Sequence, residues 1–428
     1  MRLGGRLAAA IEILDDIAAR HRPAAEALRD WGLSHRFAGV GDRAAIGNLV
    51  YDALRRRRAA SWLLDGETSR ALVFGGYLLE RGTAPAALDA ALADDRFAPA
   101  LLDESDLSGL ADRLGKPLPD GARANVPAWC EPMMEAAFGA AWVEEGEALA
   151  ARPPLDMRAN TLKASRDKVL AALARAGAAP ARIAANGMRI PPVSGDGRHP
   201  NVQVEPAFRK GWFEVQDEGS QAVATLAGAA PGMQVLDFCA GAGGKTLAMS
   251  AAMENRGQIH AFDADRQRLA PIFDRLKRAG CRNVQVVGQE EGLAPLEGQM
   301  DLVLVDAPCT GSGTWRRRPD AKWRLSPQQL EARLAEQAAI LDTASRYVKP
   351  GGRLAYVTCS VFTQENADQA RAFLQRGSAF RSIDHERLWH DTFPQAAGLA
   401  HIDRETGIVL TPATSGTDGF YFVAFERV

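Results

Sequence analysis

Two cysteines in this sequence follow apolar runs of strand length, each at a place where the chain must turn. Cys309 lies in VLVDAPCTGSG at 303–313, and Cys359 lies in YVTCSVF at 356–362. A thiol on such a turn is accessible, and its thiolate is a strong nucleophile. Asp306 precedes Cys309 by three residues and supplies a carboxylate that can offset charge on a bound ring. These residue types indicate covalent catalysis by a thiol.

Such a pair suits the methylation of a pyrimidine at C5. C5 is too weak a nucleophile to attack a methyl sulfonium, but a thiolate that adds to C6 turns C5 into an enamine-like carbon. A base must then remove the C5 proton before the thiol can leave, and a second thiol can serve this release. Asp306 can hydrogen-bond the N3/N4 edge of a cytosine, and Pro308 stiffens the turn. The alternative, that a cysteine is a small buried hydrophobe, is our prediction for Cys130, Cys239 and Cys281.

A glycine-rich loop, VLDFCAGAGGKT at 235–246, follows another apolar run and begins a predicted helix. Its glycines let the backbone approach a ligand closely, and the helix N-terminus favours a negative group. The loop is not a P-loop, because Cys239 stands where a Walker A motif needs its first glycine. The dinucleotide fingerprint fails as well, because Thr246 occupies the place of the third glycine.

An acid, Asp263, ends the next apolar run about twenty residues farther on. A carboxylate at this position can accept two hydrogen bonds from ribose hydroxyls. An adenosyl ligand without a pyrophosphate fits the arrangement, so we expect S-adenosylmethionine as the cofactor. The alternative is a packing loop with a helix-capping aspartate.

Residues 212–428 alternate short apolar runs with helix-sized segments, which predicts a doubly wound α/β domain with a mostly parallel sheet. The tail GFYFVAFERV predicts a late antiparallel strand at the edge. Ligands bind beyond the carboxyl ends of such strands, where the strand order reverses. If the fourth and fifth runs are neighbours, Cys309 and Cys359 face one crevice. The runs are QVLDFC, QIHAFD, VQVVG, DLVLVD and RLAYVTC.

Two further domains are predicted before this one. Residues 1–142 have apolar positions three and four apart, which indicates a helical bundle. Residues 143–211 predict a small α/β domain, in which LDMRAN forms a strand and a helix runs from its cap Ser165 to Gly177. The apolar stripe of the clearest helix in the bundle comprises Ile46, Leu49, Val50, Ala53 and Leu54.

The chain of 428 residues has a net charge of −2 and five cysteines without a CxxC pair. The odd number argues against a disulfide framework and the spacing against zinc, so we expect free thiols, no metal and a cytoplasmic protein. The N-terminal segment is not a signal peptide, because Glu12, Asp15 and Asp16 interrupt its apolar stretch at helical spacing. We expect no association with a membrane.

Positive charge is concentrated in two places. Residues 1–64, which end in an arginine-rich helix, and the segment WRRRPDAKWR at 315–324 each have a net charge of +4. Arginines can bind phosphates and neighbouring tryptophans can stack on bases, which predicts contacts with RNA. The alternative is a solvated charged face with Trp315 and Trp323 in the core. The candidate RNA-binding residues are Arg55, Arg56, Arg316, Arg317, Arg318 and Lys322.

In combination, these segments resemble the Sun/Fmu family of RNA cytosine-C5 methyltransferases, the RsmB-like group. The likeness is carried by LDFCAGAGGKT, DAPCTGSGTWRRRPDAKW, YVTCSVFTQEN and DGFYFVAFERV. PPLDMRANTLKASRDKVLAAL resembles the small domain of the family, and DRAAIGNLVYDALRRRRAASWLLDG is similar to its NusB-like RNA-binding domain. The resemblance implies a Rossmann-like methyltransferase domain with a mostly parallel seven-stranded sheet, preceded by those two domains.

The resemblance also implies roles for single residues. Cys359, in the T-C-S motif, is then the nucleophile that adds to C6, and Cys309, in the P-C motif, assists release of the product, whereas DNA methylases use the P-C cysteine as nucleophile. Lys245 orients the cofactor carboxylate or the base. The family has an acid after the third strand that contacts the adenosine; Gln289 stands there, so Gln289 or Glu290 takes this contact. The implied cofactor contacts are Cys239, Ala240, Gly241, Ala242, Gly243, Gly244, Lys245, Asp263, Gln289 and Asp306.

We therefore expect a monomeric enzyme that makes 5-methylcytosine in RNA, foremost in 16S ribosomal RNA during rRNA processing, without a DNA or membrane partner. One alternative is a methyltransferase that acts on another RNA such as tRNA. A methyltransferase that acts on protein or small molecules has no use for a crevice with paired thiols. The remaining alternative is an RNA-binding ribosome-assembly factor with weak or no turnover, against which the intact Cys309, Cys359 and glycine loop argue.

Overall fold

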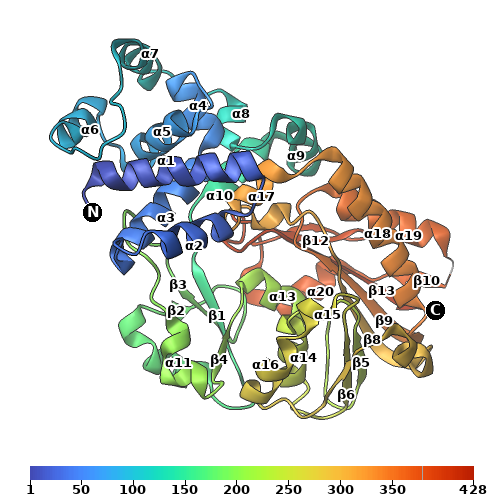
Figure 1. Ribbon diagram of the computed structural model, residues 1–428. Helices are drawn as coiled ribbons and strands as arrows, with labels where there is room; N and C mark the ends of the chain where they lie inside the picture. Colours follow the sequence, from blue (N-terminus) through green and yellow to red (C-terminus); the bar gives the residue numbers. More distant parts are fainter. Residues whose placement is uncertain (378) are drawn as a thin grey trace. The chain divides into compact units, whose positions relative to one another are not determined.

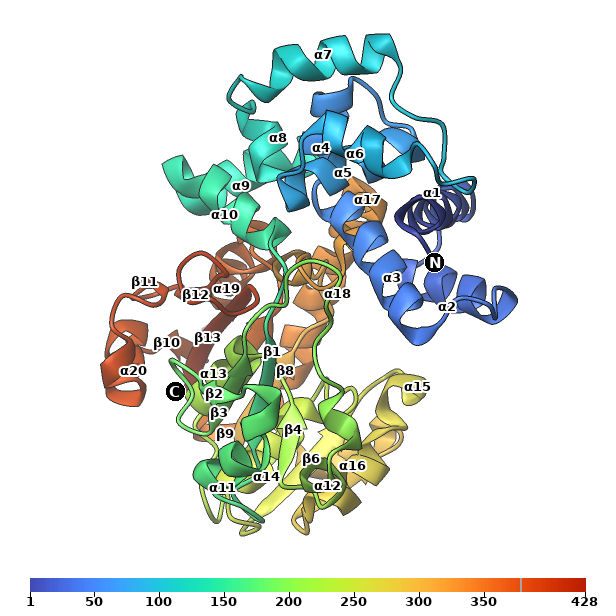
Figure 2. The ribbon, with the colours of Figure 1, turned by 90° about the vertical axis from the view of Figure 1, so that its left-hand side faces the viewer.

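The computed structural model describes residues 1–377 and 379–428, which divide into two compact units. Figures 1 and 2 show the helices and strands of both units in two views. The first unit consists of Met1–Arg152, Val193–Arg198 and Trp315–Leu325. The second consists of Pro153–Pro192, His199–Thr314 and Ser326–Val428. The predicted domain boundaries after residues 142 and 211 stay predictions.

The regular elements described for the first unit are helices, as the sequence predicts. The apolar stripe of α3 is buried in the core of the unit, and a glycine permits close packing of α5 on α4. A Cβ atom on Gly75 would lie 2.8 Å from the Cα of Ala60. The helices are α1 (Leu3–Arg20), α2 (Ala24–Ser34), α3 (Val40–Arg55), α4 (Arg57–Leu64), α5 (Ser69–Arg81), α6 (Pro85–Leu92), α7 (Glu104–Leu114), α8 (Asp120–Ala124), α9 (Glu131–Phe138) and α10 (Trp142–Ala150).

The segment Trp315–Leu325 belongs to the first unit, although the chain on both sides of it belongs to the second. It contains α17 (Pro319–Arg324), which packs on α3 (Figure 1). The indole nitrogen of Trp323 donates to the carbonyl of Leu54 at 2.7 Å, and Trp315 is fully buried. The two tryptophans are therefore core residues of the helical unit.

The second unit contains a small antiparallel sheet with the order β2-β3-β1-β4. The predicted helix of this region begins as expected, because Ser165 accepts a hydrogen bond from the backbone of Lys168. Gly177, with a φ of 75°, ends the segment in the left-handed region. The elements are β1 (Leu155–Ala159), β2 (Ala179–Pro180), β3 (Gly187–Ile190), β4 (Phe213–Val215) and α11 (Arg166–Ala172).

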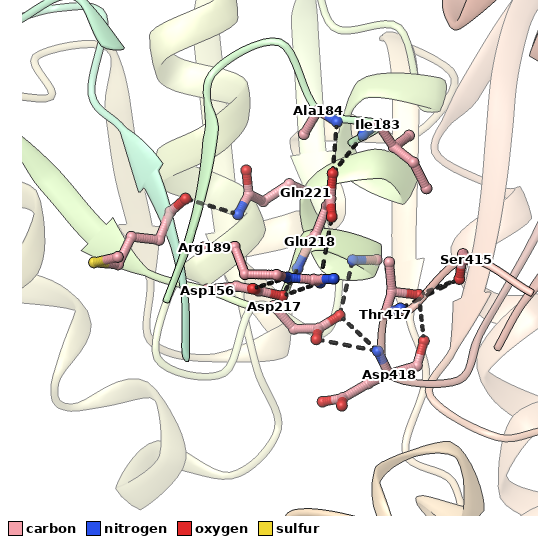
Figure 3. Close-up of polar contacts among 12 residues, drawn as sticks. Asp156, Ile183, Ala184, Arg189, Asp217, Glu218, Gln221, Ser415, Thr417 and Asp418 are labelled. Atoms are coloured by element: carbon pink, nitrogen blue, oxygen red, sulfur yellow. Dashed lines mark hydrogen bonds and ion pairs between the residues drawn. The ribbon is translucent and has the colours of Figure 1, made fainter. Parts of the chain in front are cut away.

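An ionic network of one half-buried arginine and two buried carboxylates joins this small sheet to α13 (Glu218–Leu226) (Figure 3). Arg189 on β3 donates to the two oxygens of Asp156 on β1, at 2.6 and 2.7 Å. The same guanidinium forms an ion pair with Glu218 at 3.3 Å. Each of these charged groups has a partner of opposite sign, which offsets the cost of burying it. The network fixes the small sheet on the first helix of the larger α/β structure.

The larger sheet is built from the predicted apolar runs. Its order is β11-β12-β13-β9-β8-β5-β6-β7, with β10 also paired to β13. The strands from β5 to β9 are parallel and β13 is antiparallel to β9, which confirms the predicted α/β fold. The strands are β5 (Gln234–Asp237), β6 (Gln258–Phe262), β7 (Val284–Val287), β8 (Met300–Asp306), β9 (Val348–Thr358), β10 (Phe380–Ser382), β11 (His401–Asp403), β12 (Gly407–Leu410) and β13 (Phe420–Arg427).

The predicted edge position of the tail strand is wrong. β12 and β10 pair with β13 on the side away from β9, so β13 lies inside the sheet and its residues from Phe420 to Phe425 are buried. The sheet of the described residues has nine strands, two more than the seven that the resemblance implies, and three of the nine, β10, β11 and β12, lie beyond β13.

Helices cover both faces of this sheet. Leu302 and Leu304 on β8 belong to the core on one face, and Val303 and Val305 belong to the core on the other. Among the described residues, no helix combines the length and the apolar character that a membrane crossing requires. The remaining helices are α12 (Pro206–Arg209), α14 (Gly244–Ala252), α15 (Arg266–Leu269), α16 (Ile272–Ala279), α18 (Pro327–Ser345), α19 (Ala367–Arg376) and α20 (His385–Thr392).

Candidate active site

The structure brings the two predicted cysteines together at the carboxyl ends of neighbouring strands. Cys309 follows β8 and Cys359 directly follows β9, and these strands are parallel. Their sulfur atoms are 3.4 Å apart. Both side chains are half-buried, so the pair is partly open to a substrate.

The two thiols are not electrostatically equivalent. The hydrogen bond with Cys359 raises the pKa of Cys309 well above its ordinary value, and burial and the negative charge of Glu365 act in the same direction. Cys309 therefore holds its proton more firmly than an ordinary thiol does.

The glycine loop between β5 and α14 has the backbone geometry that a closely approached ligand needs. Gly241 and Gly243 have φ values of 51° and 82°, in the left-handed region that favours glycine. A Cβ atom on Gly243 would lie 2.5 Å from Cγ1 of Ile272 on α16. The sequence of this loop is therefore dictated both by its turn and by the helix packed behind it.

Asp263, directly after β6, lies beside this loop. One carboxylate oxygen accepts from the backbone of Gly241 at 2.8 Å, and the other accepts from the backbone of Asp265 at 2.9 Å. Each oxygen keeps a lone pair for a ribose hydroxyl, so the residues present fit the adenosyl cofactor. Gln289 and Glu290 follow β7, the next strand, and both are exposed.

Lys245 connects the glycine loop with the cysteine turn. Its ammonium group donates to Asp306 at 2.5 Å, and its side chain is only 6% exposed. The ring of Phe420 lies under the same ammonium group, 5.3 Å from its nitrogen. Asp306 ends β8, three residues before Cys309, so one ion pair lies between the predicted cofactor loop and the thiols.

The side chain of Cys239 points into the core, so only its backbone belongs to the loop surface. Its side chain is 9% exposed and belongs to the core under the sheet. Burial raises the pKa of this thiol well above its ordinary value. This environment agrees with the interpretation of Cys239 as a small buried hydrophobe. Cys130 is likewise buried, whereas Cys281 is half-buried.

Burial argues against direct RNA contact by three of the candidate basic residues, all in the first unit. Arg55 is buried, pairs with Asp52 at 3.2 Å and donates to the carbonyl of Arg316. Arg316 is also buried. Lys322 is 1% exposed, and burial together with nearby arginines lowers its pKa to about 7.

The other three candidates remain accessible. Arg56 is half-buried and donates to Glu80 at 2.6 Å, Arg317 is half-buried, and Arg318 is exposed. The alternative weighed from the sequence was a solvated charged face with Trp315 and Trp323 in the core. The tryptophans do pack in or against the core, but Arg316 and Lys322 are buried and not solvated. The charge count alone did not distinguish these two environments.

Sequence reasoning missed several polar residues around the site. Asp237 ends β5 under the glycine loop, and its buried carboxylate accepts from the hydroxyl of Thr246 at 2.6 Å. Glu365 and Asn366 close the YVTCSVFTQEN segment and contact both cysteine turns. Two features of the sequence could have identified them. Asp237 is an acid at the end of an apolar run, and Glu365 and Asn366 are adjacent polar residues soon after the T-C-S motif.

The fold and this site together define an S-adenosylmethionine-dependent methyltransferase. A doubly wound sheet, a glycine loop after its first parallel strand and a buried acid after the next one are the arrangement that the predicted adenosyl site requires. The paired thiols and the Lys245–Asp306 ion pair lie at the same end of the sheet, beyond β8 and β9.

Comparison with known proteins assigns the family. Residues 224–426 match the model of the 16S rRNA methyltransferase RsmB/F, and residues 126–191 match the ferredoxin-like domain of RsmF/B-like methyltransferases. Ribosomal RNA small subunit methyltransferase B of Erwinia tasmaniensis is 30% identical over 92% of this chain and 92% of its own. The enzyme of the same name from Salmonella paratyphi A is 32% identical over 78% of this chain and 82% of its own.

Solved structures share the fold of this chain. The crystal structure of PH0851 has a TM-score of 0.73 at 23% identity and covers 100% of this chain and 99% of its own. A methyltransferase homolog from Pyrococcus horikoshii has a TM-score of 0.59 at 25% identity, over 72% of this chain and 98% of its own. The chain belongs to the RsmB/F family of 16S rRNA methyltransferases.

Proposed function

We propose that this protein methylates C5 of a cytosine in 16S ribosomal RNA, through a covalent bond between Cys359 and C6. The observation that carries the proposal is the 3.4 Å separation of the Cys309 and Cys359 sulfurs beside the Lys245–Asp306 ion pair. The names of the relatives support ribosomal RNA as the substrate. We also propose that it acts in the cytoplasm as a monomer.

In the first step the Cys359 thiolate forms a bond to C6, and the electrons of the C5–C6 double bond become available at C5. Asp306 accepts a hydrogen bond from the N3/N4 edge of the ring and offsets positive charge there. Lys245 holds Asp306 in place. When bound, S-adenosylmethionine supplies the electrophilic methyl group that the activated C5 takes.

Release of the product is an elimination. The C5 proton leaves to a base, its electron pair restores the C5–C6 double bond, and the C6–S bond breaks with its electrons on the Cys359 sulfur. Cys309 lies in hydrogen-bond contact with that sulfur, so it can stabilise the departing thiolate. The raised pKa of Cys309 is consistent with a residue that holds a proton at this stage.

The test uses labelled S-adenosylmethionine and ribosomal RNA from a strain that lacks the enzyme. We expect label at cytosine C5 with the wild-type protein and a loss of at least about 1,000-fold for Cys359→Ala, which lacks the nucleophile. Cys309→Ala should instead accumulate a protein–RNA adduct that resists denaturation.

Label on uridine or on protein would contradict the substrate assignment. An adduct that accumulates in Cys359→Ala, together with a loss of adduct formation in Cys309→Ala, would reverse the roles of the two cysteines. RNA binding without any methyl transfer would favour the assembly-factor alternative, and methylation confined to tRNA would replace the ribosomal substrate.

A further inference from the structure

A carboxylate outside the predicted site lies buried next to the Cys309 turn. Glu365 ends the short 3₁₀ helix Thr363–Glu365 and is fully buried. One of its oxygens accepts from the backbone of Thr310 at 2.8 Å, and the other accepts from the Thr310 hydroxyl at 2.5 Å. Glu365 therefore holds the residue that directly follows Cys309.

The residue that precedes Cys309 is held by the same group. Gln337 on α18 donates to Glu365 at 3.0 Å and also to the carbonyl of Pro308 at 2.9 Å. Pro308 and Thr310 flank Cys309, and both are fixed by one buried pair, Glu365 with Gln337. The turn has little freedom to move its sulfur without breaking these bonds.

The next residue along the chain does the same for the second cysteine. Asn366 accepts from the hydroxyl of Thr358 at 2.6 Å and donates to the carbonyl of Ser360 at 2.9 Å. Thr358 and Ser360 flank Cys359. Two consecutive residues, Glu365 and Asn366, thus hold the neighbours of both reactive cysteines.

The charge of Glu365 needs an explanation, because a buried carboxylate is costly unless it is compensated. Its side-chain partners among the described residues are neutral donors from Thr310 and Gln337, and no lysine or arginine forms an ion pair with it. Packing alone could be provided by a glutamine of the same shape. A carboxylate at this position differs from a glutamine because it also raises the pKa of the Cys309 thiol.

We propose that Glu365 and Asn366 form a clamp that sets the separation of the two reactive sulfurs, and that Glu365 is a positioning residue for Cys309 during product release. This inference rests on the proposed function. The first part concerns geometry and is carried by the hydrogen bonds on both sides of each cysteine. The second part concerns electrostatics: the charge of Glu365 acts on the thiol of Cys309.

The groups that face Cys309 are known. They are Cys359 from the turn after β9, Glu365 from the 3₁₀ helix and, farther along β9, the hydroxyl of Tyr356. Gln337 on α18 carries no charge. The negative charge of Glu365 is one of the causes that raise the pKa of Cys309. Its removal should lower that pKa, so that Cys309 holds its proton less firmly.

The first experiment compares Glu365→Gln with Asp368→Asn. Asp368 lies on the same segment but is exposed and pairs with Arg371, so its variant controls for loss of a carboxylate. We expect Glu365→Gln to form the RNA adduct normally but to release methylated RNA up to about 100-fold more slowly, because the charge that helps to keep the proton on Cys309 is lost. The KM for S-adenosylmethionine should not change.

The second experiment needs neither RNA nor cofactor. The rate of alkylation of Cys309 by iodoacetamide is measured against pH, with the modified peptide quantified by mass spectrometry. We expect the midpoint to lie at lower pH in Glu365→Gln than in the wild type and in Asp368→Asn. A merely structural role of Glu365 would not shift this midpoint in a folded variant.

Thr310→Val provides a second variant if Glu365→Gln is unstable. It removes only the hydroxyl that donates to Glu365 and should reproduce part of the delay in release. Release at the wild-type rate in both variants, with an unchanged alkylation midpoint, would overturn the clamp. A wild-type protein that makes no 5-methylcytosine would overturn the proposed function instead, and the alkylation result would still decide whether the charge of Glu365 acts on Cys309.

Discussion

Asp237 is a buried acid beneath the cofactor loop, and its protonation affects the stability of the fold. Its side chain is 1% exposed, and burial raises its pKa from 3.8 to about 7 against the opposing hydrogen bond from Thr246. The charged groups around it are Asp306, Lys245 and Asp263. Two of these are acids, so the neighbourhood itself disfavours a further negative charge.

The sign of the pH effect follows from these values. Unfolded chains lose this proton near pH 4, whereas the folded protein keeps it up to about pH 7. Between these limits the folded state binds more protons, so this group makes the free energy of unfolding fall as the pH rises, by about 4 kcal/mol at most.

Asp237→Asn should therefore flatten the pH dependence of stability. The asparagine does not titrate and still accepts from the Thr246 hydroxyl. Denaturant unfolding of both proteins at several pH values from about 4 to about 8 measures the difference. Identical slopes for the wild type and the variant would show that Asp237 is ionised throughout this range.

Single residues of the site were predictable where their type carries the chemistry. Cys309, Cys359 and Asp306 were found from side-chain type and position after a strand, and the structure places them together. Glu365 and Gln337 were not found, because their contacts join segments far apart in the chain. The burial of Lys322 was missed because a count of charges does not reveal which side of a helix is covered.

At the scale of elements, the glycine loop depends on the helix behind it. Gly243→Ala places a Cβ atom 2.5 Å from Ile272 on α16 and forces an L residue to a φ of 82°. We expect a loss of stability of at least about 1 kcal/mol and a weaker affinity for S-adenosylmethionine, because the loop must move away from the helix. Calorimetry of cofactor binding and thermal unfolding measure the two effects.

Gly298→Ala is the matched control. Gly298 has a φ of 67°, but a Cβ atom there has no neighbour within 4 Å. This variant carries the backbone strain without the collision, so it should lose stability and keep its cofactor affinity. Equal cofactor affinities in the two alanine variants would show that the collision with Ile272 does not affect cofactor binding.

The strands of the sheet were predictable to different degrees, for a physical reason. Parallel strands from β5 to β9 are covered on both faces, so their sequences are continuous apolar runs of recognisable length. β10 and β11 have only three residues each, none of them buried, and they leave no such run. Missing these strands placed β13 at the edge, although its apolar sequence already suited an interior strand.

At the scale of the whole molecule, the first unit is assembled from three separate stretches of the chain. Its core is completed by residues 315–325, which are synthesised only after most of the second unit. The sequence did not reveal this arrangement, because the segment directly follows the Cys309 loop and its charge suggested a surface role. The packing of Trp315 and Trp323 places this segment in the first unit.

Trp323→Phe should loosen the helical unit selectively. The change removes the hydrogen bond to the carbonyl of Leu54 at 2.7 Å and weakens the contact with Arg57, whose guanidinium lies 5.1 Å from the indole ring. A loss of about 1 kcal/mol is expected for the hydrogen bond. Hydrogen exchange followed by mass spectrometry should show faster exchange in α3 and α17, with β5 to β9 unchanged.

Trp212→Phe is the corresponding change in the second unit. Trp212 is half-buried and contacts Lys168, whose nitrogen lies 4.2 Å from the centre of its ring. This variant should leave exchange in α3 at the wild-type rate. Unchanged exchange in α3 of Trp323→Phe would contradict this prediction. The segment 315–325 would then be buried against α3 without contributing to the stability of that helix.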